Sequence, residues 1–248
     1  MNKIGIIGGT GIYSPELLKN PVKSVITTPY GKPGSDIISG TIGDKDVVML
    51  FRHGIHHTLP PSEINYRANI YALKEAGCDC IIVTTACGSL RNEIERGDIV
   101  FPDQFIDFTK NRKATFFELF KQGEMKHTQM ADPFSNEIRK ILSDAAGKLN
   151  LKYHNSGTLI TIEGPRFSSR AESEMFRIWG ADIINMTTAT EVILANELGI
   201  SYAAIALSTD YDCWKKDEIP VSTDEIMKVF NNNLKNINLL IKQIIPLL

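Results

Sequence analysis

The chain has 248 residues, of which 43% are hydrophobic and 23% charged, and its 27 basic and 29 acidic residues give a formal net charge of −2. This composition is ordinary for a soluble globular protein of one or two domains. It argues against a nucleic-acid partner, because no basic block is present. It also argues against a membrane protein, because no apolar run approaches the length that spans a bilayer.

The cysteine and histidine residues do not have the spacing of a metal site. Cys78 and Cys80 form a C-x-C pair, and no second pair completes a zinc set. His53, His56 and His57 have helical spacing, but two prolines that follow closely would end any helix holding them on one face. We therefore expect no metal, and reduced, half-buried thiols. The N-terminal segment is too short and too glycine-rich for a signal peptide, so we expect a cytoplasmic location.

Apolar runs and helical patterns alternate along the chain. The runs that we predict to be strands are Lys3–Ile7, Ile37–Ile42, Val47–Phe51, Cys80–Thr85, Ile99–Phe101, Thr158–Ile162, Ile183–Asn185 and Tyr202–Leu207. The segments that we predict to be helices are Ser62–Ala76, Ser135–Leu149, Ser169–Trp179, Glu191–Leu198 and Ser222–Ile245. Because no linker or repeat divides this alternation, we predict one α/β domain over residues 1–248 with a largely buried sheet.

Two helix starts and one long loop have signatures of their own. Ser169 and Ser222 each precede a glutamate by three residues, which is the pattern of a capping box. In the last predicted helix, apolar residues recur at spacings of three and four, which predicts one buried face. The polar segment Thr109–Thr128 is the best candidate for a mobile or interface loop.

The first predicted strand runs into the glycine-rich turn Gly8-Gly9-Thr10-Gly11. Glycines let the backbone approach a ligand, and successive N–H groups can cradle an anion. The turn does not fit a dinucleotide site, because the third glycine of G-x-G-x-x-G is missing and no acid follows at the distance of a ribose-binding residue. By itself, such a turn is a weak indication of a ligand.

Three further strand ends carry groups suited to an oxyanion. One strand is followed by Arg52 and His53, and the planar fork of an arginine suits phosphate. Thr85 ends a second strand, and Thr187 and Thr188 follow a third. Because α/β proteins bind ligands at the carboxyl ends of their strands, the four strand ends together predict an anion site.

Two carboxylates, Asp210 and Asp212, follow the apolar run Tyr202–Leu207. Apolar and aromatic residues surround them, and like charges held close together raise the pKa of one of the two acids. A protonated aspartic acid at this place would be a proton donor.

The motifs GGTGI, RHG, TTACGSL, TIEGPRFSSRAE, NMTT and TDYDCW together resemble those of the trimeric purine nucleoside phosphorylase family, over nearly the whole chain. The resemblance implies an α/β fold with a mixed, partly barrel-like central sheet flanked by helices. It implies that inorganic phosphate, a co-substrate, attacks C1′ of a purine nucleoside while the purine leaves, and that no cofactor takes part. It also implies a homotrimer, with the pairing of trimers into hexamers left open.

The resemblance assigns roles to individual positions. The positions that match the family's phosphate site are Thr10, Arg52, His53, Thr85, Ala86 and Thr187. The positions that match its nucleoside site are Phe167 beside the purine, Met186 under the ribose, Ser168, Asp210 and Asp212 at the base, and Thr223, Ile226 and Met227 at the 5′ group. His127 matches a residue that a neighbouring subunit brings to the 5′ end. Asp210 and Asp212 are the implied catalytic residues.

The residues at the base position favour adenine. Family members that act on 6-oxopurines resemble one another in having Glu and Asn at the positions of Ser168 and Asp210. A carboxyl group can accept a hydrogen bond from N6 of adenine and donate one to N7, whereas an Asn amide is a poor acid. This chemistry favours an adenine nucleoside, and the resemblance implies that the reaction is phosphorolysis of 5′-methylthioadenosine to adenine and 5-methylthioribose 1-phosphate, in purine and methionine salvage.

Other functions are compatible with parts of the sequence. Thr223 stands where an aliphatic residue is common, and the chain ends at Leu248 without the C-terminal segment of longer relatives, so a broader enzyme could also accept adenosine. A phosphorylase for 6-oxopurine nucleosides or 5′-methylthioinosine is a second alternative, against which Asp210 argues. A hydrolytic nucleosidase would not need Arg52 and the threonines. A catalytically silent nucleoside-binding protein is disfavoured, because no expected catalytic position is altered.

Overall fold

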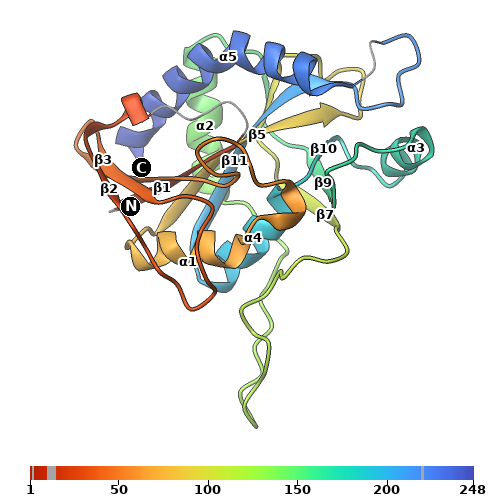
Figure 1. Ribbon diagram of the computed structural model, residues 1–248. Helices are drawn as coiled ribbons and strands as arrows, with labels where there is room; N and C mark the ends of the chain where they lie inside the picture. Colours follow the sequence, from red (N-terminus) through yellow and green to blue (C-terminus); the bar gives the residue numbers. More distant parts are fainter. Residues whose placement is uncertain (2, 10–14, 219–220) are drawn as a thin grey trace.

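The computed structural model describes residues 1, 3–9, 15–218 and 221–248, and its strands form one mixed sheet (Figure 1). The strands are β1 (Lys3–Gly8), β2 (Lys19–Ser24), β3 (Ile37–Ile42), β4 (Lys45–Phe51), β5 (Cys80–Ser89), β6 (Ile99–Val100), β7 (Gln104–Phe108), β8 (Tyr153–His154), β9 (Thr158–Ile162), β10 (Ile183–Asn185) and β11 (Ser201–Asp210). The helices are α1 (Tyr66–Glu75), α2 (Asn136–Lys148), α3 (Arg170–Ile178), α4 (Thr188–Glu197) and α5 (Thr223–Ile244), with three short 3₁₀ helices at Pro15–Leu17, Pro61–Glu63 and Ile245–Leu247.

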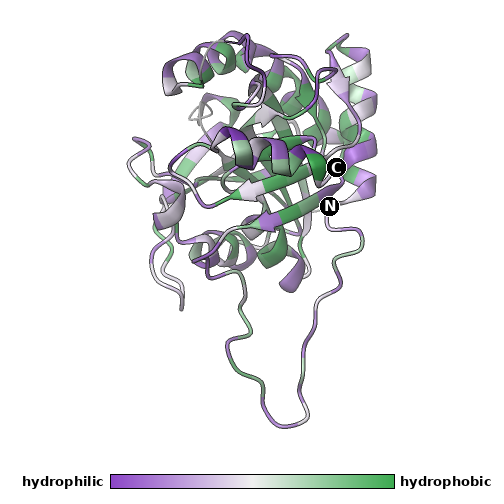
Figure 2. Ribbon diagram, turned by 90° about the vertical axis from the view of Figure 1, so that its right-hand side faces the viewer, coloured by the Kyte–Doolittle hydropathy of each residue, from purple (hydrophilic) through white to green (hydrophobic). Residues whose placement is uncertain are grey.

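Helices cover both faces of the sheet, as the near-continuous apolar strands predict. Successive side chains of a strand point to opposite faces. In β1, Ile4 and Ile6 pack in the core cluster that contains residues of α2 and α5, whereas Ile7 packs in the cluster that contains residues of α1 and α4. Figure 1 shows α5 on one side of the sheet and α1 and α4 on the other. Figure 2 shows apolar residues concentrated on the strands between these helices.

The strand β5 is shared between two parts of the sheet, and this creates the opening in which the site lies. Its first residues, Cys80 to Val83, pair with β1, while its last residues, Gly88 and Ser89, pair with β10 in the antiparallel direction. On its other side β11 runs parallel to it over nearly its whole length. Between Val83 and Gly88, β5 has therefore left β1 and has not yet met β10. The carboxyl ends of β1 and β10 face each other across this part of β5, which is the position where α/β folds bind ligands.

The chain between β7 and α2 extends away from the sheet (Figures 1 and 2). It contains the predicted loop Thr109–Thr128, in which the structure has no helix or strand. The base of this segment is fixed to the end of α4, because the Thr115 hydroxyl and the Phe116 N–H both donate to the Glu197 carboxylate, at 2.7 and 2.6 Å.

The predicted elements are all present, but the sequence missed β2, β7 and β8. These three strands are the ends of the sheet: β2 and β7 end its main path, and β8 ends the branch through β11 and β6. Edge strands are short, half-exposed and tolerant of proline, so they lack the apolar runs by which we recognised the other strands. All six residues of β2 are exposed, and one of them is Pro21. Over the described ranges, no helix is long and apolar enough to cross a membrane.

Candidate active site

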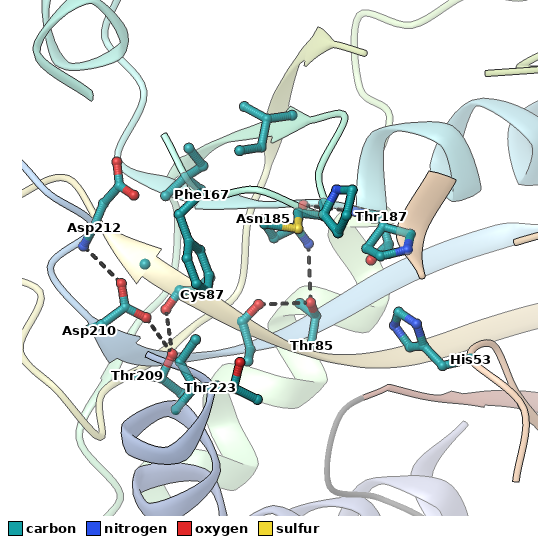
Figure 3. Close-up of a pocket in the computed structure, with 18 of the residues that line it drawn as sticks. His53, Thr85, Cys87, Phe167, Asn185, Thr187, Thr209, Asp210, Asp212 and Thr223 are labelled. Carbon is teal, nitrogen blue, oxygen red and sulfur yellow. Dashed lines mark hydrogen bonds between the residues drawn. The ribbon is translucent and has the colours of Figure 1, made fainter. Parts of the chain in front are cut away.

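A cavity of about 460 Å³ lies at the opening beside β5. It is lined by Arg52, His53, Thr85, Ala86, Thr187, Phe167, Met186, Asp210, Asp212, Thr223, Ile226 and Met227, all of which the sequence analysis had singled out. Figure 3 shows His53 at one end, Asp210 and Asp212 at the other, and Thr85 between them. The structure therefore brings the predicted anion-binding groups and the predicted acids into one cavity.

At the anion end, Arg52 follows directly after β4 and is only 1% exposed. Its guanidinium forms a bidentate ion pair with Glu191, with Nε–Oε1 and Nη2–Oε2 distances of 2.6 and 2.9 Å. Its Nη1 donates to the Thr84 carbonyl oxygen at 2.9 Å. The sequence analysis did not single out Glu191, which lies inside α4.

His53 is a neutral ring beside Arg52. Its Nδ1 lies 2.8 Å from the Leu59 carbonyl oxygen. Because a carbonyl only accepts, Nδ1 carries the proton and Nε2 is an acceptor. Burial, together with the positive charge of Arg52, lowers the pKa of His53 to about 3, so the ring stays uncharged at neutral pH. The ring of His57, which also lines the cavity, stacks on it with a centroid distance of 4.2 Å.

Hydroxyl groups and a helix N-terminus complete this end of the cavity. The Thr85 hydroxyl donates to the Ala86 carbonyl and accepts from the Asn185 amide at 3.1 Å (Figure 3). Asn185 also donates to the Thr188 hydroxyl at 2.6 Å. Thr187 is the N-cap residue of α4, and its side chain makes no capping bond in the described part of the chain. Its hydroxyl and the positive end of the α4 dipole are therefore suited to bind an anion.

Thr85 and Asp210 lie inside strands that are longer than we predicted. β5 continues from Thr85 to Ser89 because Gly88 and Ser89 pair with β10. β11 continues from Leu207 to Asp210, with a register shift between Ser208 and Asp210. Ala86 and Gly88 thus belong to the ladder rather than to a loop after the strand.

The two acids at the other end are buried and differ in their partners. Asp210 Oδ2 accepts from the Thr209 hydroxyl and Oδ1 from the backbone N–H of Asp212, both at 2.8 Å (Figure 3). Burial raises the pKa of Asp210 to about 6, and the charge of Asp212 adds to this shift, although the two hydrogen bonds oppose it. Burial also raises the pKa of Asp212. Gly88 makes room for this carboxyl, because a Cβ there would lie 2.8 Å from Asp210 Oδ1.

Apolar side chains form the walls between these two ends. Phe167 and Met186 both line the cavity. The Met186 side chain passes over Gly164, where a Cβ would lie 2.5 Å from its sulfur and where φ is +65°. The Met186 carbonyl accepts from Arg112, whose guanidinium also pairs with Glu163 at 2.6 Å. Arg112 thus joins the start of the long projecting segment to the wall of the cavity.

Two of the described residues that we predicted for the site, Ser168 and His127, do not line the cavity, and several residues that line it were not predicted. Thr10 lies outside the described residues. The Ser168 hydroxyl lies near Asp212, where it opposes the rise in the pKa of that acid. His127 lies in the projecting segment and packs against Phe120 with a ring-centroid distance of 5.9 Å. The lining residues that the sequence analysis did not name as site residues are His57, Pro61, Cys87, Gly88, Ile162, Pro165, Ile184, Asn185 and Thr209.

Comparisons with known proteins agree with this architecture. Residues 3–246 match the model of the phosphorylase superfamily. S-methyl-5′-thioadenosine phosphorylase of Xenopus tropicalis is 51% identical over 98% of this chain and 88% of its own length, and that of Danio rerio is 50% identical with the same shares covered.

Solved structures lead to the same family. Methylthioadenosine phosphorylase from Schistosoma mansoni in complex with adenine superposes with a TM-score of 0.94 at 40% identity, over 100% of this chain and 92% of that one. A mutant adenosine/methylthioadenosine phosphorylase from the same organism, in complex with methylthioadenosine, has a TM-score of 0.93 at 40% identity, over 100% of this chain and 91% of that one. The chain therefore belongs to the phosphorylase superfamily and, within it, to the methylthioadenosine phosphorylase family.

Proposed function

We propose that the chain catalyses the phosphorolysis of 5′-methylthioadenosine to adenine and 5-methylthioribose 1-phosphate, and so is a pentosyltransferase of purine and methionine salvage. One observation carries the proposal: a single cavity joins an anion compartment at Arg52 and Thr187 to a buried acid, Asp210, whose pKa is raised to about 6. A reaction that uses phosphate at one end of the substrate and protonates a leaving group at the other needs both.

The chemistry divides between the two ends. In the transition state positive charge develops on the ribose ring and negative charge on the departing purine, so an oriented phosphate stabilises the first and a proton donor the second. Arg52, Thr85 and Thr187 supply the donors that hold phosphate. Asp210 delivers its proton to N7 of the purine, and Asp212 supports this by raising the pKa of Asp210.

The acid at the base end supports adenine as the purine. A protonated Asp210 offers one O–H donor for N7 and keeps acceptor capacity for the N6 amino group. Ser168 contributes indirectly in this structure, because its hydroxyl lies near Asp212 rather than on the cavity wall. Methylthioinosine and other 6-oxopurine nucleosides are therefore disfavoured.

The 5′ group is received at the start of α5. Ile226 and Met227 give this end an apolar wall and Thr223 adds a hydroxyl. The apolar wall fits a methylthio group, and the hydroxyl fits the 5′-OH of adenosine. We propose 5′-methylthioadenosine as the preferred substrate and adenosine as a slower one, in keeping with the solved Schistosoma relative named for both activities.

We propose that the enzyme is cytoplasmic and uses phosphate as its co-substrate without a cofactor. We also propose that it is a homotrimer. The basis for the homotrimer is the projecting segment, where Leu119 is 93%, Met125 74% and Phe120 45% exposed. Exposed apolar side chains of this size indicate a contact surface. His127, on the same segment, then reaches the 5′ end of a neighbouring subunit's cavity.

The test is base release from 5′-methylthioadenosine, adenosine and inosine, each with and without inorganic phosphate. We expect fast adenine release from methylthioadenosine, slower release from adenosine and very little from inosine, all requiring phosphate. The phosphorus NMR signal of a pentose 1-phosphate should grow in step with adenine. Equal rates without phosphate would make the chain a hydrolase.

A further inference from the structure

Glu191 is a buried acid that the proposed reaction does not use. It is 0% exposed and lies in the first turns of α4, beside the anion compartment. Both of its carboxylate oxygens bond to Arg52, and its Oε2 also accepts from the Tyr202 hydroxyl at 2.8 Å. Arg52 directly follows β4, whereas Glu191 lies in α4 and Tyr202 in β11, so the contact joins three parts of the fold that surround the cavity.

This pairing fixes the orientation of the Arg52 guanidinium. The planar carboxylate and the planar guanidinium meet in a bidentate arrangement, which permits one relative orientation. The third bond, from Nη1 to the Thr84 carbonyl, prevents rotation about that pairing. Gly9 packs closely against this bond, since a Cβ there would lie 2.2 Å from Nη1 and 2.4 Å from the Thr84 oxygen.

Two donors of Arg52 are left for a ligand. A guanidinium has five N–H bonds, and the three contacts above use one each on Nε, Nη1 and Nη2. One N–H on each terminal nitrogen has no partner among the described residues, and Arg52 lines the cavity. Two fixed N–H groups on adjacent nitrogens match two oxygens of a phosphate.

The charges lead to the same conclusion. The positive charge of Arg52 is already balanced by Glu191, and His53 is neutral because its pKa is lowered to about 3. The compartment therefore has no excess positive charge from these residues. It must hold phosphate through the direction of its N–H and hydroxyl donors, and this makes the placement of Arg52 decisive.

We propose that Glu191, held in turn by Tyr202, is a positioning residue for phosphate, which aims the two remaining N–H groups of Arg52 into the anion compartment. The proposal rests on the phosphorolysis proposed above. The opposite possibility is that Glu191 occupies the place of phosphate and competes with it. Loss of the Glu191 charge should weaken phosphate binding if Glu191 positions Arg52, and should strengthen phosphate binding if Glu191 competes.

The test compares Glu191→Gln and Tyr202→Phe with wild type in steady-state kinetics and in calorimetric titration with inorganic phosphate. Glu191→Gln keeps the shape but replaces one charged acceptor oxygen by an amide that repels Arg52. We expect the phosphate KM and the phosphate Kd to rise about 10- to 100-fold, in line with the loss of a hydrogen bond to a charged group. The KM for methylthioadenosine should change less than about threefold. Tyr202→Phe should change the phosphate values in the same direction by a smaller factor.

The matched control is Asp98→Asn, which removes the charge of another buried, ion-paired carboxylate that does not line the cavity. It should leave the phosphate KM unchanged even if it lowers the melting temperature. An unchanged phosphate Kd in folded Glu191→Gln would overturn the proposal, and a lowered one would show competition instead. If Glu191→Gln does not fold, Tyr202→Phe decides by the same criterion. If the activity of the wild-type enzyme does not depend on phosphate, the proposed reaction itself is refuted. If the wild-type enzyme depends on phosphate but the two variants bind phosphate as tightly as wild type, only the proposed role of Glu191 is refuted.

Discussion

At the scale of single residues, the protonation of Asp210 sets the expected pH dependence of the reaction. Its pKa is raised to about 6, chiefly by burial. The active form of a general acid is the protonated one, so activity is retained below this pKa and is lost as the pH rises through it. We expect kcat/KM for methylthioadenosine at saturating phosphate to fall about tenfold per pH unit above pH about 6. The fall in kcat should begin at higher pH, because N7 of the bound substrate's adenine accepts a hydrogen bond from protonated Asp210 and so stabilises the protonated form.

Asp212 provides the control for this assignment. Its charge raises the pKa of Asp210. Asp212→Asn removes that charge and keeps the backbone N–H that donates to Asp210, so the fall in kcat/KM should move to lower pH. A shift to higher pH, or none, would show that another group controls the profile.

Arg52 binds phosphate in our proposal and also neutralises Glu191, so its removal has two effects. Arg52→Ala should raise the phosphate KM more than the nucleoside KM. It also leaves Glu191 buried without its partner, which should lower the free energy of unfolding by about 3–5 kcal/mol. The double variant Arg52→Met, Glu191→Leu should recover most of that stability in urea unfolding but none of the phosphate affinity. Wild-type phosphate affinity in the folded double variant would exclude Arg52 from the phosphate site.

At the scale of elements, the start of α3 shows how closely a local sequence pattern can determine structure. Ser169 and Glu172 form the predicted capping box, in which each side chain accepts from the backbone N–H of the other residue. The Glu172 carboxylate also pairs with Arg166, and this holds the loop that carries Phe167. Ser169→Ala should lower the free energy of unfolding by about 1 kcal/mol. Urea titration measures this, and Ser169→Asp, which keeps an acceptor, should be close to wild type.

Local patterns account for most of the fold, because central strands buried on both faces must be apolar. We missed the edge strands β2, β7 and β8 because a strand at the edge of a sheet is partly exposed and therefore does not need an apolar run. The split of the sheet at β5 was also missed, since the sequence does not reveal that Gly88 and Ser89 turn from one partner strand to another. This split, rather than four separate strand ends, places Thr85 opposite Asn185.

In the site, too, local patterns revealed some residues, whereas others are recognised only in the folded chain. Strand ends identified Arg52, Thr187 and Asp210, because their chemistry follows directly after an apolar run. Asn185 and Glu191 are also buried in the site region. Asn185 belongs to the apolar run that we predicted as a strand, and Glu191 lies within a helix, so we assigned neither of them to the site. Glu191 is separated from Arg52 by 139 positions, so only the folded chain shows their pairing.

At the scale of the whole molecule, the proposed trimer predicts that subunits share sites. His127 is exposed on the projecting segment and does not line its own cavity. Chains with His127→Ala and chains with Asp210→Asn should each have low activity. After mixing by reversible unfolding, some cavities will combine an intact Asp210 with an intact His127 from a neighbour, and activity should exceed the sum of the two. Sedimentation of a fully active monomer, or strictly additive activity, would contradict the shared site.

The central claim is that Asp210, at the base end of the cavity, both protonates the leaving purine and selects adenine. It is tested most directly by the ratio of kcat/KM for methylthioadenosine to kcat/KM for methylthioinosine, measured in wild type and in Asp210→Asn. The substitution preserves shape but removes the transferable proton, so methylthioadenosine should lose about 10²- to 10⁴-fold. Methylthioinosine should lose less, because an Asn amide can donate to O6, and Asp210→Asn with Ser168→Glu should shift the ratio further. The account predicts a ratio that falls by at least about tenfold in Asp210→Asn; a ratio equal to that of wild type would contradict it.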